Sequence, residues 1–148
     1  MSTETSRLPL ENFTSLYQSL TPGNVSRQQL AGVYSEKVEF SDPMHRIQGL
    51  NQLTDYFQGL YSNLKSIDFD FHRTMTRDGE TIAHWTMTFS HPQLYRGNRT
   101  ITVEGISLLT WENDLIIRHQ DIFDAGALLY EHLPVLGWII RKLKERMA

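Results

Sequence analysis

Alternation of apolar and polar residues in the second half of the chain constrains the fold more than any other sequence feature. In Ile67–His72 every second side chain is apolar, which is the pattern of a strand with one buried face. Asp78-Gly79 is a strong signal for a two-residue hairpin turn. The alternation resumes after it, and turn residues follow at Gly97-Asn98 and Glu112–Asp114. This pattern predicts three or four long antiparallel strands over residues 67–123.

The first half of the chain has the period of helices instead. Apolar residues recur there at intervals of three and four in three segments, and Ser26 is the expected N-cap of the second segment. The three helices are expected over residues 13–20, 27–34 and 50–60. Between the last two, Val38–Ser41 is predicted as a short strand that ends at Asp42-Pro43. Helices combined with an antiparallel sheet in this order predict an α+β fold.

Composition limits the classes of function. The 148 residues include 17 acidic and 14 basic side chains, and the net charge of −3 argues against nucleic acid as a partner. The sequence has no cysteine, which excludes disulfides, thiolate nucleophiles and zinc sites built on sulfur. No apolar run reaches the roughly 18 residues of a membrane span, and residues 1–12 do not resemble a signal peptide. We therefore expect a cytoplasmic protein that is at most peripheral to a membrane.

Two segments carry a family resemblance. The first runs from Tyr34 to Phe57 and contains Val38–Pro43, and the second runs from Gly105 to Asp124. They resemble the nuclear-transport-factor-2-like superfamily, which includes SnoaL-like polyketide cyclases, ketosteroid isomerase and limonene epoxide hydrolase. The resemblance covers roughly residues 13–123. It implies a strongly curved mixed or antiparallel sheet wrapped around N-terminal helices, which forms a cone with a central pocket, plus a C-terminal helix. It also implies homodimers through the convex sheet face.

The resemblance suggests catalytic roles for two residues of the first half. Asp42, before a proline at a strand end, matches the general base of ketosteroid isomerase, and an apolar pocket favours proton abstraction by a carboxylate. The alternative is an Asp that accepts hydrogen bonds from its own turn. Tyr17 matches the oxyanion-hole tyrosine, or else is a core tyrosine. The second oxyanion donor would fall near Gly105 or Ile106, where no donor side chain exists, and this weakens the match to a steroid isomerase.

His119 and Asp121 form a third candidate pair. They are two residues apart on the last predicted strand, so they point to the same face as Phe123, which we expect to be the inner one. Limonene epoxide hydrolase has its water-activating Asp at the position of Asp121. Its tyrosine, however, matches Phe40, which cannot bind water, so epoxide hydrolysis is in doubt. The pair can act with Asp42 in catalysis, or it can be a hydrogen bond between buried polar groups.

These candidates lead to two hypotheses for the function. The first is an enzyme without cofactor or metal that uses a carboxylate base for isomerisation, cyclisation or water addition on a small hydrophobic substrate. The second is a non-catalytic module of the same fold that binds an apolar ligand or a protein. In both, we expect the ligand to contact a set of mostly aromatic side chains, namely Phe40, Tyr56, Trp85, Met87 and Phe123.

The two ends of the chain are expected to differ from the domain between them, which we place at residues 9–132. Residues 1–8 are polar and rich in Ser and Thr, and we expect a disordered tail there. Residues 133–148 combine apolar side chains with four cations and predict a basic amphipathic helix. Such a helix can close the pocket, pack on the domain, or make peripheral contact with an anionic membrane through residues 134–148.

Overall fold

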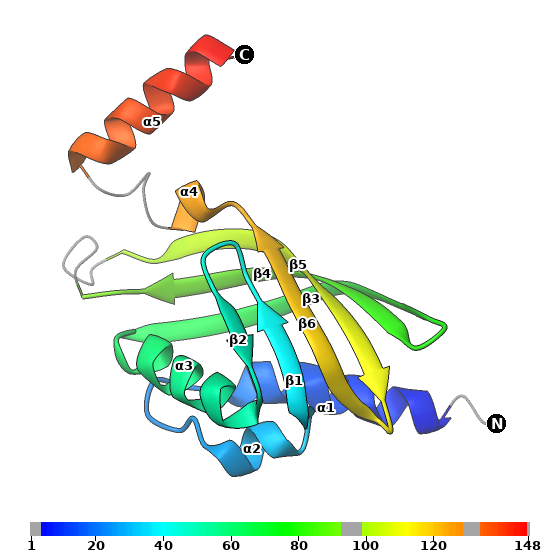
Figure 1. Ribbon diagram of the computed structural model, residues 1–148. Helices are drawn as coiled ribbons and strands as arrows, with labels where there is room; N and C mark the ends of the chain where they lie inside the picture. The colour runs from blue at the N-terminus through cyan, green and yellow to red at the C-terminus, as the bar shows by residue number, and fades with distance from the viewer. Residues whose placement is uncertain (1–3, 93–98, 129–133, 148) are drawn as a thin grey trace.

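A curved sheet forms the centre of the fold in the computed structural model, which describes residues 4–92, 99–128 and 134–147 (Figure 1). Within these ranges the sheet has six strands in the order β2-β1-β6-β5-β4-β3. The strands are β1 (Tyr34–Ser41), β2 (Arg46–Gln48), β3 (Ser66–Arg77), β4 (Glu80–Ser90), β5 (Ile101–Glu112) and β6 (Leu115–Phe123). Neighbouring strands run antiparallel except β1 and β6, which are parallel, so the sheet is mixed.

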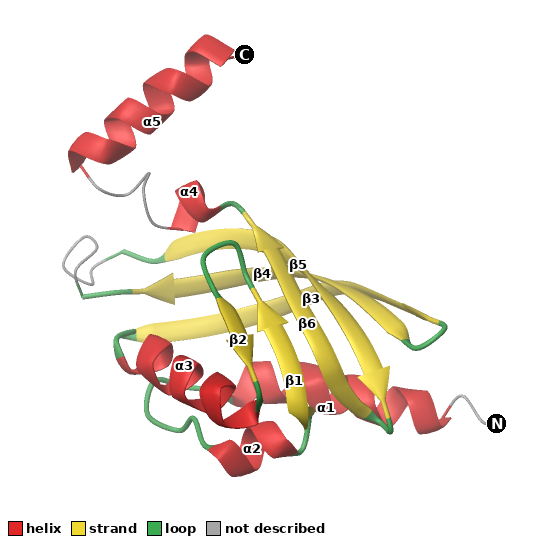
Figure 2. Cartoon of the chain, viewed as in Figure 1, coloured by secondary structure: helices red, strands yellow, loops and turns green. Residues whose placement is uncertain are grey.

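Helices α1 (Glu4–Ser19), α2 (Arg27–Ala31) and α3 (Leu50–Ser62) pack on the concave side of this sheet (Figure 2). Helices α4 (Ala125–Leu128) and α5 (Pro134–Met147) follow β6 at the C-terminal end of the chain. Side chains of α1 and α3, such as Phe13 and Leu53, join inward side chains of the sheet in one hydrophobic cluster. This arrangement confirms the α+β prediction.

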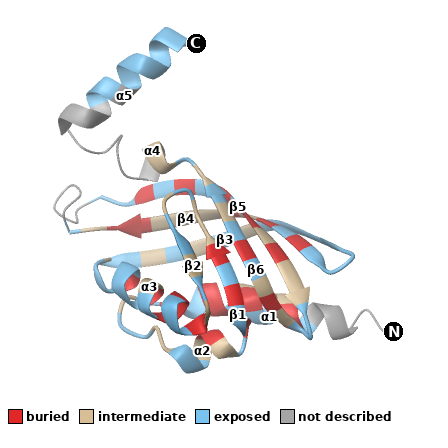
Figure 3. Ribbon diagram, viewed as in Figure 1, coloured by how far each residue is buried: buried red, intermediate tan, exposed pale blue. Residues whose placement is uncertain are grey.

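The long strands follow from the alternation of the sequence. Burial alternates along β5 from Ile101 to Leu109, with every second side chain in the interior (Figure 3). The two tight turns, Asp78-Gly79 and Asn113-Asp114, have positive φ at both central residues, which matches the right-handed twist of the strands that they join. Four long strands, β3 to β6, are therefore present in the second half, where three or four were predicted. The expected turn at Gly97-Asn98 lies outside the described residues.

The first half differs from the prediction in three places. The first helix begins at Glu4, so residues 4–8 are helical where we expected a tail. The second helix ends at Ala31, and Tyr34 begins β1 instead of ending that helix. Strand β2 was not predicted. The reason at Tyr34 is a long-range contact, because this residue pairs with Ile116 of the parallel strand β6, and local periodicity carries no information about that pairing.

Candidate functional site

A cavity of about 300 Å³ lies between the helices and the concave face of the sheet. It has the volume of about ten water molecules, which suits a small ligand. Its wall is mostly apolar and comes from α1, α3, β1, β3, β4 and β6. The side chains that we predicted to contact the ligand all lie in this wall: Phe40, Tyr56, Trp85, Met87 and Phe123.

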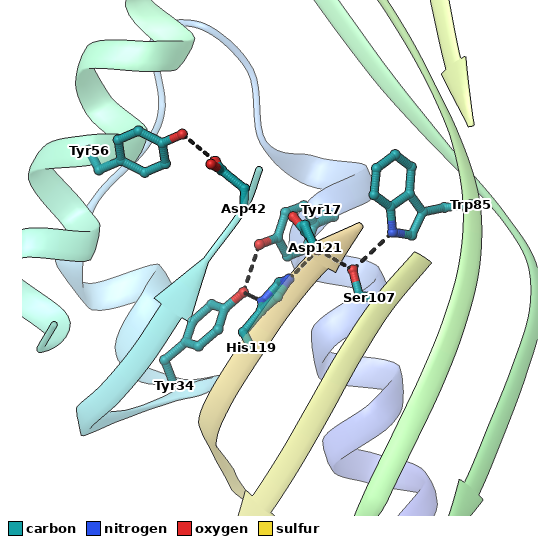
Figure 4. Close-up of polar contacts among 8 residues, drawn as sticks. All are labelled: Tyr17, Tyr34, Asp42, Tyr56, Trp85, Ser107, His119 and Asp121. Carbon is teal, nitrogen blue, oxygen red and sulfur yellow. Dashed lines mark hydrogen bonds and ion pairs between the residues drawn. The ribbon is translucent and has the colours of Figure 1, made fainter. Parts of the chain in front are cut away.

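Asp121 is the carboxylate that β6 presents to the cavity. Its Oδ1 accepts two hydrogen bonds, from Ser107 Oγ at 2.5 Å and from His119 Nε2 at 2.6 Å (Figure 4). Its Oδ2 accepts no hydrogen bond from the described residues. The Asp121 side chain is 16% exposed and belongs to the wall of the cavity. Two donors thus fix the carboxylate through Oδ1, and no described residue donates to Oδ2.

Ser107 is itself held in place by Trp85. The indole Nε1 of Trp85 donates to Ser107 Oγ at 2.9 Å, and the Ser107 hydroxyl uses its own proton to reach Asp121. Trp85 can lie over strand β5 because Gly105 has no side chain, and a Cβ there would be 2.3 Å from the indole Cη2. Gly105 therefore leaves room for Trp85. Trp85 holds Ser107, and Ser107 in turn holds Asp121.

A second line of hydrogen bonds leads from Asp121 back to the cavity. The His119 side chain is almost fully buried, and its Nδ1 lies 2.8 Å from the hydroxyl of Tyr34. The Tyr34 hydroxyl is 2.6 Å from that of Tyr17, which lines the cavity. With the imidazole proton on Nε2, His119 donates to Asp121, its Nδ1 can accept from Tyr34, and Tyr34 in turn accepts from Tyr17. His119 thus contacts Asp121 from behind the cavity wall.

The tyrosines of the site remain protonated at neutral pH. Burial is the main cause that raises the pKa of Tyr17 and of Tyr34 well above the usual range, and the nearby negative charge of Asp121 raises both further. Burial also raises the pKa of Tyr61, again with a contribution from Asp121. Because each phenol keeps its proton, these residues are hydrogen-bond donors and not bases at neutral pH.

Asp42 lies in the wall of the same cavity but has more partners. Its Oδ1 accepts from the backbone N–H groups of Met44 and His45, at 2.9 and 2.8 Å, and its Oδ2 accepts from the Tyr56 hydroxyl at 2.5 Å. Burial, together with this hydrogen bond, raises the pKa of Tyr56, so its hydroxyl stays a donor. The hydrogen bonds expected of a turn-stabilising Asp are therefore present, and both oxygens of Asp42 are occupied.

The sequence also matches a family model described as the SnoaL-like domain, over residues 13–119. The chain belongs to the SnoaL-like family. None of the curated proteins compared with this chain matches it.

Solved structures share the fold at low sequence identity. A putative SnoaL-like polyketide cyclase from Jannaschia sp. CCS1 is 11% identical, with 83% of this chain and 90% of that chain aligned and a TM-score of 0.70. An LEH-like epoxide hydrolase from M. tuberculosis is 15% identical, with 87% of each chain aligned and a TM-score of 0.65. A protein with a ketosteroid isomerase-like fold from Catenulispora acidiphila is 10% identical, with 82% of this chain and 88% of that chain aligned and a TM-score of 0.69. At these identities the likeness shows the fold alone.

The hydrogen-bond network around Asp121 contains two residues that sequence analysis did not identify as part of the site. Tyr34 was assigned to a helix, and Ser107 was not singled out. The sequence pattern could have indicated Ser107. It is a polar residue at an inward position of β5, where other inward residues such as Val103 and Leu109 are apolar, and a buried polar group needs a hydrogen-bond partner. Of the predicted catalytic residues, Tyr17, Asp42 and Asp121 line the cavity, and His119 does not appear in its described lining.

Within the described part of the SnoaL-like chain, no three His, Asp or Glu side chains are grouped so that they could hold a metal ion. The polar residues of the cavity wall are two carboxylates, three tyrosines, two histidines and one asparagine: Asp42, Asp121, Tyr17, Tyr56, Tyr61, His45, His91 and Asn63. Asp42 and Asp121 follow Ser41 and Gln120, which are paired across β1 and β6, so the two carboxylates lie at the same end of neighbouring strands.

Proposed function

We propose that this SnoaL-like protein is an enzyme that removes a proton from a small apolar substrate, with Asp121 as the general base. The observation that carries the proposal is the asymmetry of the Asp121 carboxylate. Oδ1 accepts from Ser107 and His119, Oδ2 has no partner among the described residues, and the side chain belongs to the wall of the apolar cavity. A base must reach its proton with one free oxygen in a fixed position, and this carboxylate has both properties.

The rest of the site supports this chemistry. The apolar wall displaces water from a bound substrate, so Oδ2 competes with few solvent molecules for the proton. His119 Nε2–H donates to Oδ1 and keeps its place whether the carboxylate is charged or has taken up a proton at Oδ2. Tyr17 places a protonated phenol in the same wall, where it can donate to an oxygen that gains negative charge. Asp42 stabilises its turn and orients Tyr56.

The reaction classes that we consider are isomerisation, cyclisation and water addition. Each begins with removal of a proton, from carbon in the first two and from water in the third. The names of the structural neighbours, a putative polyketide cyclase and an LEH-like epoxide hydrolase, fall within these classes. Phe40 offers no hydrogen-bonding group to a water molecule, which favours proton removal from carbon.

Proton abstraction can be tested with a probe that reports on a base without knowledge of the natural substrate. Nitrobenzisoxazole is a small, flat, apolar molecule whose ring opens to a coloured cyanonitrophenolate when a base removes its carbon-bound proton. We expect saturable ring opening by the wild-type protein and a loss of about 100-fold or more in kcat/KM for Asp121→Asn. The asparagine keeps an oxygen that can accept from Ser107 and His119, so the cavity should stay intact.

The matched control is Asp70→Asn, which removes one exposed carboxylate outside the cavity and should leave kcat/KM unchanged. An Asp121→Asn variant as active as the wild type would contradict Asp121 as the base. If the wild-type protein binds the probe, as seen by quenching of tryptophan fluorescence, and yet opens no ring, the non-catalytic binding module is the better description.

A further inference from the structure

Helix α5 is the feature of the molecule that the cavity and its chemistry do not explain. It extends away from the sheet beyond α4 (Figure 1). Among the described residues, α5 does not pack along any other helix or strand, although an ion pair between Lys144 and Asp124 connects it to the body at 3.4 Å. None of its described side chains belongs to the cavity wall.

The exposed side of α5 carries large apolar side chains in a helical stripe. Ile139, Leu143 and Met147 are spaced four residues apart, so they lie above one another on one side of the helix. They are 44%, 53% and 86% exposed. Trp138 is 56% exposed and lies on a different side of the helix, the side that carries Lys142. Solvent contact on this scale is costly for apolar side chains, which indicates that another surface covers the stripe.

Cations surround this stripe. Arg141, Lys142, Lys144 and Arg146 are all exposed, and Glu145 is the single acidic residue of the segment 134–148. The segment therefore has a net charge of +3, while the remaining residues contain 10 basic and 16 acidic side chains and have a net charge of −6. The positive charge of α5 stands out against an acidic body, so the helix is complementary to a negatively charged surface.

We propose that α5 docks the protein on an anionic phospholipid membrane, with Ile139, Leu143 and Met147 inserted among the acyl chains. An exposed apolar stripe selects a surface that can be penetrated, and the cations select negative headgroups. Trp138 lies on the side of Lys142, whose Nζ is 6.0 Å from the centroid of its ring, and both side chains suit the headgroup region of the membrane. No helix in the described ranges is long and apolar enough to cross a bilayer, so α5 lies on the surface.

Co-sedimentation with vesicles tests this proposal. We expect the protein to pellet with vesicles of phosphatidylcholine containing 30 mole per cent phosphatidylserine, at roughly tenfold or higher partitioning than with pure phosphatidylcholine. The variant Arg141→Gln/Lys142→Gln/Lys144→Gln/Arg146→Gln should lose this difference. Ile139→Ser/Leu143→Ser should also lose partitioning, because it removes the inserted groups and keeps the charge.

The matched control removes the same number of cations from the body, at exposed positions outside α5: Lys37→Gln/Arg46→Gln/Arg73→Gln/Arg77→Gln. It should pellet like the wild type. Equal loss in both quadruple variants would overturn the proposal in favour of non-specific charge attraction. Concentration-dependent pelleting without vesicles that Ile139→Ser/Leu143→Ser abolishes would overturn it in favour of a second copy of the chain as the partner.

A spectroscopic measurement locates the contact within the helix. Trp138 is exposed, whereas Trp85 is buried in the cavity wall and Trp111 is partly buried. Insertion should shift the tryptophan emission of the wild-type protein to shorter wavelength when anionic vesicles are added. Trp138→Phe should abolish the shift while the protein still pellets. A shift of equal size in Trp138→Phe would show that the contact lies elsewhere and would overturn the proposal.

Discussion

Asp42 and Asp121 are carboxylates in the wall of one cavity, and their hydrogen bonds distinguish their roles. Asp42 accepts hydrogen bonds at both oxygens, two of them from its own turn. Asp121 accepts hydrogen bonds from the described residues at one oxygen alone, Oδ1. Sequence alone cannot make this distinction, because it does not show which donors each carboxylate meets in the fold. The difference arises from Ser107, which is paired with Asp121 on the neighbouring strand β5, and from His119, which lies on β6 itself.

The buried tyrosines predict a loss of stability at alkaline pH. An unfolded tyrosine releases its proton near pH 10, whereas burial raises the pKa of Tyr61 in the folded protein. Above pH 10 the folded state therefore binds more protons than the unfolded state, and the free energy of unfolding falls as pH rises. Tyr61→Phe removes one such group, so this fall should be shallower than in the wild type by about 1.4 kcal/mol per pH unit.

Urea unfolding from pH 7 to pH 11 measures this effect. Between pH 7 and pH 9 the difference in free energy of unfolding between wild type and Tyr61→Phe should be constant, which provides the internal control. Above pH 10 the free energy of unfolding should fall more steeply for the wild type than for Tyr61→Phe. Parallel curves over the whole range would show that Tyr61 ionises in the folded protein as it does in the unfolded chain.

At the level of single elements, sequence predicts what depends on local pattern. Strands β3 to β6 and the cap of α2 at Ser26 follow from alternation, turn residues and capping. The pairing of β1 with β6 depends on contacts between residues about 80 positions apart, and this pairing brings Tyr34 to His119. Candidate residues could therefore be named from a resemblance to known folds, but their connection through Tyr34 and Ser107 could not.

Gly105 in β5 supports a prediction about the packing of neighbouring strands. A methyl group there would be 2.3 Å from Cη2 and 2.6 Å from Cζ2 of Trp85, so the indole of β4 must move. We expect Gly105→Ala to lower the free energy of unfolding by about 1–3 kcal/mol. It should also lower the rate of ring opening of nitrobenzisoxazole, because displacement of Trp85 breaks its hydrogen bond to Ser107.

Chemical denaturation, near-ultraviolet circular dichroism and the ring-opening assay together check this prediction. Gly23→Ala is the matched control, because a Cβ at that position meets nothing within 4 Å and its stability should change by less than about 1 kcal/mol. Wild-type stability and an unchanged aromatic circular dichroism signal in Gly105→Ala would mean that the indole does not depend on this glycine.

On the scale of the whole molecule, the two faces of the sheet have different surroundings. The concave face is covered by helices and encloses the cavity, and the outer face is open in the single chain. Ile82, Ile106 and Ile122 lie on this outer face, 47%, 37% and 48% exposed, and Ile106 is paired directly with Ile122 across β5 and β6. Exposed isoleucines on neighbouring strands form an apolar patch that a second copy of the chain can cover.

We propose that the protein is a homodimer through this patch, as the resemblance to its superfamily also implies. The wild-type protein should have twice the chain mass of 17.2 kDa in light scattering coupled to size-exclusion chromatography. Ile106→Glu/Ile122→Glu should give the monomer mass, because the two-fold contact would place these like charges close together in an apolar interface. Ile139→Ser/Leu143→Ser is the control and should remain dimeric, since it changes only α5. A wild-type mass of 17.2 kDa at micromolar concentration would refute the dimer, and a dimeric double-glutamate variant would place its interface on another face.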